Sequence, residues 1–285
     1  MLSTINIGKI TVGLEGGDNV QQAMLLPGMN VFVTEYNMPQ LKVYLDASIQ
    51  KKECRWLHKF EVSDSRTECH FGVDNDGYYH YNFGIHGHIT CNLSDLTFQL
   101  STFHEPSILR FALWIVYAMG GLTLGRVPVH SSVVVAKSQE GECAVMCLGE
   151  SGTGKSTHTR LWLENIGGTH LLNDDSPILC VESGKTMVYG SPWSGKTHCY
   201  LNENHPVAAL IRIAQQPENH IDCLPVLQAF AALQPSCPPC FMKDDYLQDK
   251  LVDFVGNVLI CTPVFRLGCR PDAEAALLSH RTILG

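Results

Sequence analysis

Residues 143–156 read CAVMCLGESGTGKS and carry the strongest structural signal in the chain. Cys143–Leu148 is a short apolar run of the kind that forms a buried strand, and a glycine-rich loop follows it directly. Gly149–Ser156 matches the pattern G-x-x-x-x-G-K-S/T, and Thr157–Ile166 then predicts a helix. A strand before the loop and a helix after it are the surroundings that a phosphate-binding loop requires.

The loop has the chemistry of an anion cradle. Its glycines let the backbone approach phosphate groups closely, and the following helix adds unpaired N–H donors and the positive end of its dipole. Lys155 places an ammonium between the β- and γ-phosphates, and the hydroxyl of Ser156 is a ligand for Mg²⁺. We therefore expect ATP with Mg²⁺, although no base-reading motif separates adenine from guanine. The expected nucleotide-binding residues are Gly149, Glu150, Ser151, Gly152, Thr153, Gly154, Lys155, Ser156 and Thr157.

An acidic pair follows the next predicted strand. His170–Leu172 is a short apolar segment that ends at Asn173, Asp174 and Asp175. Ligands of open α/β sheets collect at the carboxyl ends of strands, and Mg²⁺ prefers hard oxygen ligands. We expect one carboxylate to hold the metal together with Ser156, and the other to orient an attacking hydroxyl and accept its proton. The sequence leaves open which Asp takes which role, and an Asx-rich turn is the simpler alternative.

The loop pattern occurs a second time, at Gly190–Thr197, which reads GSPWSGKT. Pro192 and Trp193 fill its centre, and no helix-forming segment follows, so we do not expect a second nucleotide cradle. The loop still offers Lys196 together with three small polar residues. It either faces the γ-phosphate or its acceptor, or it is a surface turn.

The flanking sequence predicts an α/β protein in two parts. Residues 1–104 contain alternating segments separated by turns, which indicates a mainly β region. Residues 105–285 hold the phosphate loop within a stretch of alternating strand and helix patterns, which indicates an α/β domain. Pro106 opens a helical pattern that Gly120-Gly121 is suited to end. The other expected β segments are Lys42–Asp46, Tyr78–Ile85, Leu96–Leu100, Ser131–Ala136, Val207–Ile213 and Thr262–Leu267. The other expected helices are Pro225–Leu233, Asp245–Val258 and a terminal helix that begins with Ala273–Leu278.

Composition narrows the class of protein. The chain has 285 residues, 45% of them hydrophobic, and a formal net charge of -8 without a Lys/Arg run, so we expect no nucleic-acid partner. Phe111–Leu124 is the longest apolar stretch; it is shorter than the roughly 20 residues of a membrane span, which predicts a buried helix and no membrane partner. The first residues lack a signal-peptide pattern, so we expect a cytoplasmic protein. Whether it forms homo-oligomers stays open.

Cysteines and histidines give weaker signals. The twelve cysteines are scattered, and in this context they predict buried thiols rather than disulfides. Cys237 and Cys240 form one C-x-x-C pair, which is either a pair of loop cysteines or a redox or metal-binding pair. The thirteen histidines show no metal-binding spacing.

Three segments together resemble a known family. They are Val129–Ser132 (VHSS), Leu148–Trp162 (LGESGTGKSTHTRLW) and Leu171–Leu179 (LLNDDSPIL). They are similar to the catalytic domain of HPr kinase/phosphorylase and, more distantly, to ATP-dependent phosphoenolpyruvate carboxykinase. The resemblance implies the mixed-sheet P-loop core of those enzymes. It also implies that His130 lies near the acceptor, that the acidic pair is catalytic and metal-binding, and that Lys196 is a catalytic basic residue.

The leading functional hypothesis is an ATP-dependent kinase that transfers the γ-phosphoryl group to a hydroxyl or other small-molecule acceptor, or to a protein. Lys155, His130, Lys196 and the acidic pair Asp174 and Asp175 are the expected catalytic residues. One alternative is a non-catalytic, nucleotide-binding regulatory or accessory protein. Others are a phosphoenolpyruvate carboxykinase-like activity, or the reverse reaction as a phosphorylase.

Overall fold

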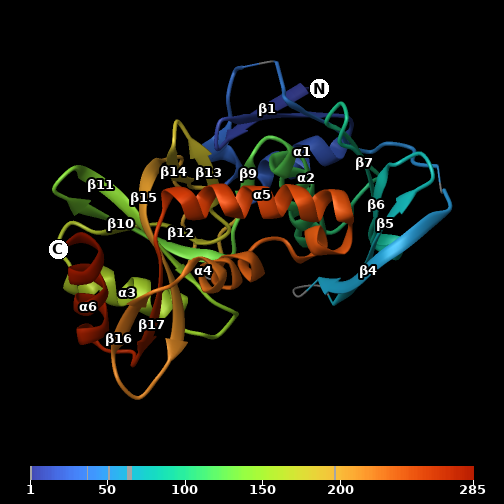
Figure 1. Cartoon of the computed structure of the whole chain (residues 1–285). Helices are drawn as coiled ribbons and strands as arrows, with labels where there is room; N and C mark the ends of the chain where they lie inside the picture. Colours follow the sequence, from blue (N-terminus) through green and yellow to red (C-terminus); the bar gives the residue numbers. More distant parts are fainter. Residues whose placement is uncertain (1, 37, 51, 63–65, 196) are drawn as a thin grey trace. The chain divides into compact units, whose positions relative to one another are not determined.

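The computed structural model describes residues 2–36, 38–50, 52–62, 66–195 and 197–285, and the chain divides into two compact units (Figure 1). The first unit comprises residues 1–124 and 240–248, and the second comprises residues 125–239 and 249–285. The chain is thus a mixed α/β protein with a mainly β first unit. The units differ in extent from the two parts expected from the sequence, because the helix that follows Pro106 belongs to the first unit.

The first unit is built on one eight-stranded sheet with the strand order β1-β2-β3-β8-β7-β6-β5-β4. The pairs β2·β3 and β3·β8 are parallel, and the other neighbouring pairs are antiparallel. Its elements are β1 (Leu2–Ile7), β2 (Ile10–Glu15), α1 (Asp18–Leu25), η1 (Met29–Phe32), β3 (Leu41–Tyr44), β4 (Cys54–Val62), β5 (Thr67–Asp74), β6 (Tyr79–Asn82), η2 (Gly84–His86), β7 (His88–Asn92), β8 (Thr97–Leu100) and α2 (Pro106–Thr123).

Helix α2 packs on this sheet, and it does not end where the sequence predicts. It begins at Pro106 as expected but continues through Gly120 and Gly121 to Thr123. A Cβ atom on Gly120 would lie 2.5 Å from the side chain of Leu41 and 3.2 Å from that of Phe98. The glycine therefore serves close packing of the helix on β3 and β8 rather than helix termination.

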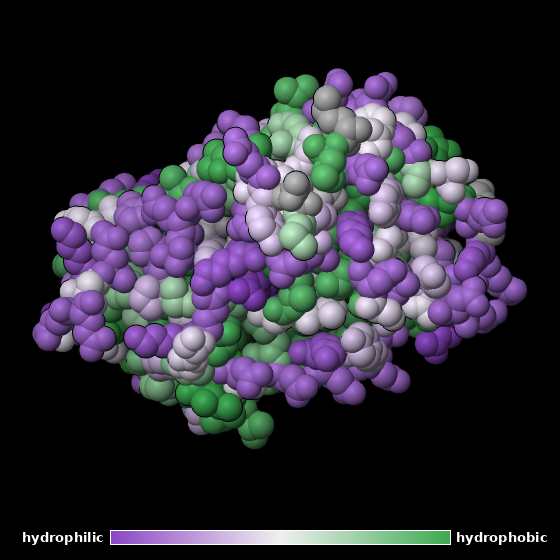
Figure 2. All heavy atoms as spheres, turned by 90° about the horizontal axis from the view of Figure 1, so that it is seen from above, coloured by the Kyte–Doolittle hydropathy of each residue, from purple (hydrophilic) through white to green (hydrophobic). Residues whose placement is uncertain are grey.

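Most of α2 is buried, as expected for the apolar stretch it contains. By length and composition the helix would suffice to cross a membrane, but 67% of it lies inside the structure. Hydrophilic residues cover most of the molecular face seen in Figure 2, with smaller groups of hydrophobic ones between them. The most exposed large apolar side chains are Ile85, Leu227 and Leu25.

The second unit is built on a mixed sheet with the strand order β12-β10-β11-β15-β14-β13-β9, and β15 also pairs with β17, which pairs with β16. The pairs β11·β15 and β15·β17 are parallel. Its elements are β9 (Arg126–Pro128), β10 (Ser131–Ser138), β11 (Gly141–Leu148), α3 (Lys155–Asn165), β12 (His170–Asp175), β13 (Ile178–Glu182), β14 (Lys185–Tyr189), β15 (Asn204–Gln215), β16 (His220–Cys223), α4 (Val226–Leu233), η3 (Gln234–Ser236), η4 (Pro239–Lys243), α5 (Asp245–Cys261), β17 (Val264–Cys269) and α6 (Ala273–Leu284), of which η4 and α5 each have residues in both units.

Strand register brings three of the sequence-predicted site segments, namely the residues before Ser131, after Leu148 and at the end of β12, to one edge of this sheet. Ser131, which begins β10, lies opposite Leu148 of β11 and Asp175 of β12. Because β10 is antiparallel to both neighbours, its first residue meets their last residues. The phosphate loop after Leu148 and the acidic pair at the end of β12 therefore leave the sheet side by side.

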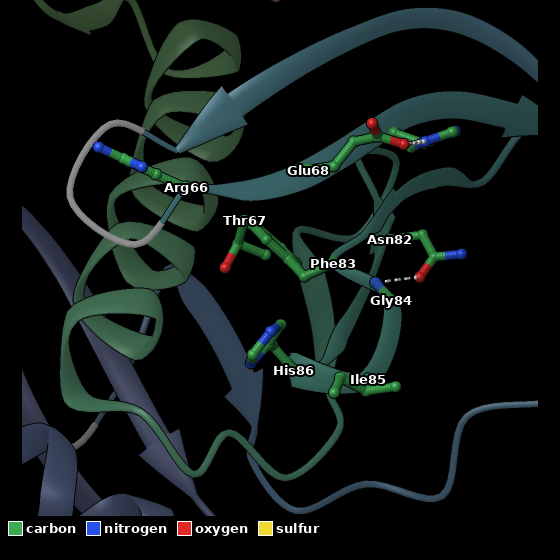
Figure 3. Close-up of a pocket in the computed structure, with 9 residues that line it drawn as sticks. Arg66, Thr67, Glu68, Asn82, Phe83, Gly84, Ile85 and His86 are labelled. Carbon is green, nitrogen blue, oxygen red and sulfur yellow. Dashed lines mark hydrogen bonds and ion pairs between the residues drawn. The ribbon is translucent and has the colours of Figure 1, made fainter.

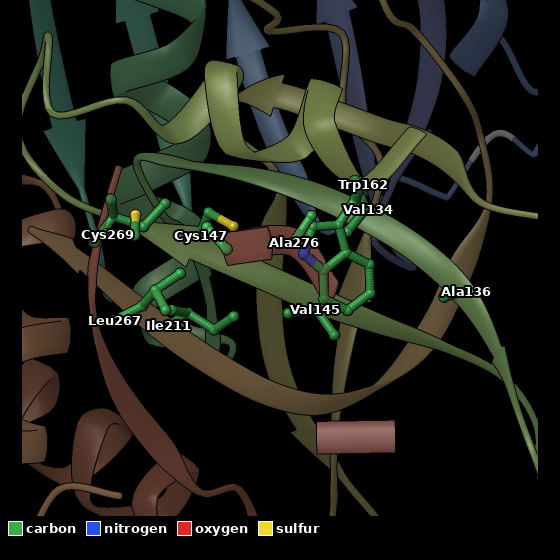
Figure 4. Packing of buried hydrophobic residues seen from close by; sticks show 11 residues of the cluster. Val134, Ala136, Val145, Cys147, Trp162, Ile211, Leu267, Cys269 and Ala276 are labelled. Atoms are coloured by element: carbon green, nitrogen blue, oxygen red, sulfur yellow. The ribbon is translucent and has the colours of Figure 1, made fainter. Parts of the chain in front are cut away.

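Helices α3 and α6 cover one face of the sheet, and their buried side chains form a hydrophobic core together with those of the strands. Figure 4 shows Trp162 of α3 among side chains of the strands, including Val134 and Val145. The cluster contains Val134, Ala136, Val145, Cys147, Trp162, Ile211, Ile213, Leu267, Cys269, Ala275 and Ala276. The helix that begins at the phosphate loop is thus anchored by its own buried residues.

The cysteines remain thiols. Each of the twelve is free, and Cys237 and Cys240 are both buried. Burial raises the pKa of Cys237 to about 12 and that of Cys240 to about 11. A buried thiol with a raised pKa is a poor nucleophile and a poor redox partner, which favours the interpretation as ordinary loop cysteines.

Candidate functional site

The phosphate loop has the backbone conformation that its glycines predict. The φ angle is 152° at Gly149, 83° at Gly152 and 105° at Gly154, a region that residues with a Cβ rarely adopt. Gly154 precedes α3, and no side chain caps the first turn of that helix. The N–H donors of the first turn therefore lie open at the loop, as an anion-binding helix terminus requires.

Lys155 is the first residue of α3, and its side chain turns back beneath the loop. It is 8% exposed. Its ammonium Nζ donates to the carbonyl oxygens of Gly149 at 2.9 Å and Glu150 at 3.1 Å, and to Nε2 of His130 at 3.0 Å. Three hydrogen bonds hold the ammonium at the centre of the site, where a phosphate oxygen competes directly for its protons.

The charge of Lys155 is set by two opposing effects. Burial lowers the pKa of Lys155 from its usual value, because water no longer solvates the ammonium. The carboxylates of Asp175 and Asp174 oppose this shift. An anion bound at this position would act in the same direction as those carboxylates and favour the charged lysine.

Asp174 lies against the hydroxyl of Ser156. The hydroxyl Oγ donates to Oδ1 of Asp174 at 2.9 Å, and Asp174 is 8% exposed. A serine hydroxyl and a carboxylate oxygen at this distance are the hard donors that Mg²⁺ prefers. The residues present therefore fit a magnesium ion bound next to the loop.

Asp175 has a different environment from its neighbour. Its Oδ1 lies 3.1 Å from Nδ1 of His130, and both side chains are nearly half exposed. The ammonium of Lys155 can only donate hydrogen bonds, so Nε2 of His130 is the acceptor of its hydrogen bond. The other ring nitrogen, Nδ1, then carries the proton and donates to Asp175. His130 thus joins the loop lysine to the more accessible carboxylate.

The second G-x-x-x-x-G-K-S/T loop lies against the backbone of the same two aspartates. Ser194 forms a backbone bridge with Asp175, and the N–H of Gly195 donates to the carbonyl oxygen of Asp174 at 3.3 Å. Lys196 lies outside the described residues. The structure thus brings His130, Lys155, Ser156 and the acidic pair together, with Ser194 and Gly195 beside them.

Asn173 fixes the acidic pair and the second loop to each other. Its buried amide Nδ2 donates to the carbonyl oxygens of Ser191 and Trp193 at 3.3 and 3.2 Å. Its Oδ1 accepts from the N–H groups of Asp175 at 3.0 Å and Ser176 at 2.9 Å. One side chain therefore sets the turn after Asp174 and holds the neighbouring loop against it.

The remaining loop residues have lesser roles. The carboxylate of Glu150 is exposed and lies 3.6 Å from Arg212, and the hydroxyl of Thr153 donates to the carbonyl oxygen of Glu150 at 2.8 Å. Ser151 is exposed at the tip of the loop, and Thr157 lies half-buried in the first turn of α3.

Two residues of β15 contact the loop without having been expected there. Arg212 pairs with Glu150, and Gln215 donates from Nε2 to the carbonyl oxygen of Gly152 at 3.3 Å. The signal for Arg212 was a charged residue inside the apolar run Val207–Ile213. Such a residue in a buried strand needs a partner, and here its partner is the phosphate loop.

A pocket in the first unit has no comparable chemistry (Figure 3). Its volume is about 390 Å³, and its lining residues are Arg66, Thr67, Glu68, His70, Asn82, Phe83, Gly84, Ile85 and His86. Glu68 is paired with His70 at 2.6 Å, and His86 with Glu105 at 2.8 Å. These side chains already have partners within the first unit, whereas the loop Gly149–Ser156 has its N–H donors open, so the loop is the candidate site.

Comparisons with known proteins find similarity to solved structures. No family model matches the sequence, and no curated protein matches it. The chain is similar to the structure of the Hpr(Ser) kinase/phosphatase from Coxiella burnetii, at 14% identity and a TM-score of 0.30, over 54% of this chain and 96% of that one. At this level the similarity assigns neither a fold type nor a function to the chain.

Proposed function

We propose that the chain is an ATP-dependent phosphotransferase that uses Mg²⁺ and transfers the γ-phosphoryl group to a hydroxyl or other small-molecule acceptor. One observation carries the proposal: two adjacent carboxylates at one sheet edge have different partners. Asp174 is buried against Ser156, and Asp175 is accessible and paired with His130. A metal ligand and a proton acceptor are the two carboxylates that phosphoryl transfer needs.

The proposed nucleotide site consists of the loop and the start of α3. The N–H groups of Gly149–Ser156 and the open first turn of α3 bind the phosphates, and Lys155 neutralises the β- and γ-phosphates. We propose that the core is the P-loop fold of the HPr kinase and phosphoenolpyruvate carboxykinase type. The motifs VHSS, LGESGTGKST and LLNDDSPIL support this fold assignment.

The proposed metal ligands are Ser156 and Asp174. Bound Mg²⁺ supplies charge neutralisation for the phosphate oxygens. Asp174 is held in place by its strand and by the hydroxyl of Ser156, so little reorganisation accompanies binding.

The proposed base is Asp175, with His130 as its positioning residue. The carboxylate accepts the proton of the acceptor hydroxyl while that oxygen forms a bond to the γ-phosphorus, and the bond from phosphorus to the β–γ bridging oxygen breaks to release ADP. His130 donates to Asp175 and so keeps the carboxylate oriented.

Two asparagine substitutions test this assignment. Asp175→Asn should keep the affinity for Mg²⁺·ATP within about threefold but lower turnover by ~10²–10⁴-fold, because the proton acceptor is lost. Asp174→Asn should also remove turnover and in addition raise the Mg²⁺ concentration required. ADP formation is measured with a metabolite extract as the source of acceptor, and binding by calorimetry.

Full turnover in both variants would contradict the proposed mechanism. Binding of Mg²⁺·ATP without ADP formation under any extract condition would instead identify a nucleotide-binding regulatory protein. Dependence of the reaction on inorganic phosphate would identify a phosphorylase.

A further inference from the structure

A second cluster of metal-ligating side chains lies at the opposite end of β12. His170 begins β12, whereas Glu203 directly precedes β15 and His205 is the second residue of β15. Nε2 of His170 is 3.2 Å from Oε2 of Glu203, and Nε2 of His205 is 3.5 Å from the same oxygen. One potential ligand atom from each of the three residues lies within 4.8 Å of the others. Residues 33 positions apart thus converge on one point.

These distances match the separations between ligand atoms in a tetrahedral metal site. Zn²⁺ binds imidazole nitrogen and carboxylate oxygen at ~2.0–2.1 Å, so two ligands of a tetrahedral site are separated by roughly 3.3 Å. The two measured separations from Glu203 lie on either side of that value. Two histidines and one glutamate are also a known donor set for zinc with one open position.

A further carboxylate lies behind the cluster. Nδ1 of His205, the nitrogen on the far side of the ring, is 4.0 Å from Oε2 of Glu142. When Nε2 binds a metal, Nδ1 carries the proton and donates it, most often to a carboxylate or a carbonyl. The His205 side chain is only 12% exposed, and its ring lies between Glu142 and Glu203.

We propose that His170, Glu203 and His205 bind one Zn²⁺ ion, with Glu142 as a positioning residue for His205. Imidazole ligands favour transition metals, whereas Mg²⁺ prefers oxygen ligands, so this site does not compete for the ion at Ser156. His170 and Asp174 lie four positions apart on β12, which is roughly 13 Å along a strand, so the two sites are distinct.

The ion would tie the start of β12 to the end of the connection that carries the second loop. His170 begins the strand that ends at the acidic pair, and Glu203 ends the connection from β14 to β15 that carries Ser194 and Gly195. Ligands from both segments on one ion would hold the end of that connection next to the start of β12. The proposal rests on the cluster alone and is independent of the proposed phosphotransferase activity.

The test uses the full chain and ZnCl₂ as the probe. The unaltered protein should bind one Zn²⁺ per chain, as measured by chelator competition, and its Tm should rise with Zn²⁺ concentration. His170→Ala and His205→Ala should each weaken binding by at least about 100-fold, and Glu142→Ala by ~10–100-fold. Glu142→Gln keeps an acceptor oxygen and should weaken it less. His220→Ala, an exposed histidine on β16, is the matched control and should change nothing.

X-ray absorption of the zinc-loaded, unaltered protein decides the ligand set even if a variant fails to fold. The expected signal is nitrogen and oxygen at ~2.0–2.1 Å with imidazole scattering, and a sulfur shell at ~2.3 Å would place the ion on cysteines and overturn the proposal. Absence of stoichiometric binding, or equal binding by the His170→Ala and His205→Ala variants in folded form, would also overturn it.

Discussion

The two loops that match G-x-x-x-x-G-K-S/T have the same residue pattern and different structures. Gly149–Ser156 follows a buried strand and begins helix α3, whereas no helix is described between Gly190 and β15. The glycines of the first loop have positive φ angles; Gly190 and Gly195 do not. The second loop instead lies with Ser194 and Gly195 against the acidic pair.

The difference shows that glycine is required in the two loops for different reasons. At Gly152 and Gly154 it permits a left-handed backbone that turns N–H groups towards a ligand. At Gly195 it permits close approach, since a Cβ there would lie 2.9 Å from the carbonyl oxygen of Asp174. The pattern alone does not define a nucleotide cradle; the strand before it and the helix after it do.

The largest expected difference between the loops is in nucleotide affinity. Lys155→Ala should weaken Mg²⁺·ATP binding by about 100-fold or more, because charge-assisted hydrogen bonds of ~1.5–3 kcal/mol each are lost. Lys196→Ala should leave binding within about threefold and lower turnover instead. Calorimetric titration of both variants measures the contrast, and equal losses of affinity would show that both lysines bind the nucleotide.

The second effect concerns the residue that connects the two loops. Asn173→Ala should lower the free energy of unfolding by about 3 kcal/mol, because it leaves the buried N–H groups of Asp175 and Ser176 without their acceptor. Ser151→Ala, at the exposed tip of the first loop, is the control and should change stability by less than ~0.5 kcal/mol. Urea unfolding measures both, and a neutral Asn173→Ala would mean that the loops are held independently.

The parts of the site that follow one another in sequence were predictable. The strand, loop and helix at residues 143–166 and the acidic pair after the next strand are local patterns, and the structure has each of them. A hairpin was overlooked although its signal is also local: β13 and β14 are joined by Ser183 and Gly184, both with positive φ. Its strands lie between the acidic pair and Gly190, where no strand was predicted.

The rest depends on contacts between distant residues and leaves no local trace. Helix α2 passes through Gly120-Gly121 because Leu41 and Phe98 pack against it. His170 is 33 residues from Glu203, so spacing could not reveal the metal-ligating cluster. Which carboxylate belongs to Ser156 and which to His130 follows from strand register, which the sequence left open.

A third effect is the pH dependence of the helix that follows the first loop. Burial lowers the pKa of His158 in α3 to about 4, and its Nε2 accepts from the indole N–H of Trp162 at 3.1 Å. The unfolded chain therefore binds this proton first as the pH falls below ~6.5, and stability is lost progressively down to pH ~4. The loss from this group should be about 3 kcal/mol by pH 4. His158→Gln should flatten the curve of unfolding free energy by that amount between pH 7 and 4; an unchanged slope would contradict the prediction.

The smallest effect separates the two uses of glycine directly. Gly152→Ala places a Cβ where no heavy atom lies within 4 Å, so its cost is backbone strain at a φ of 83°. That strain is ~1 kcal/mol and should lower Mg²⁺·ATP affinity about fivefold.

Gly195→Ala has no such strain, but its Cβ meets the carbonyl oxygen of Asp174, so the loop must move by a few tenths of an ångström. It should spare nucleotide affinity and slow turnover about fivefold, because the acidic pair is displaced while the phosphate loop is unchanged. Calorimetry and ADP formation on the same two preparations measure this crossed result. If Gly195→Ala lowers nucleotide affinity as much as Gly152→Ala does, the second loop contacts the triphosphate and the distinction between the two loops fails.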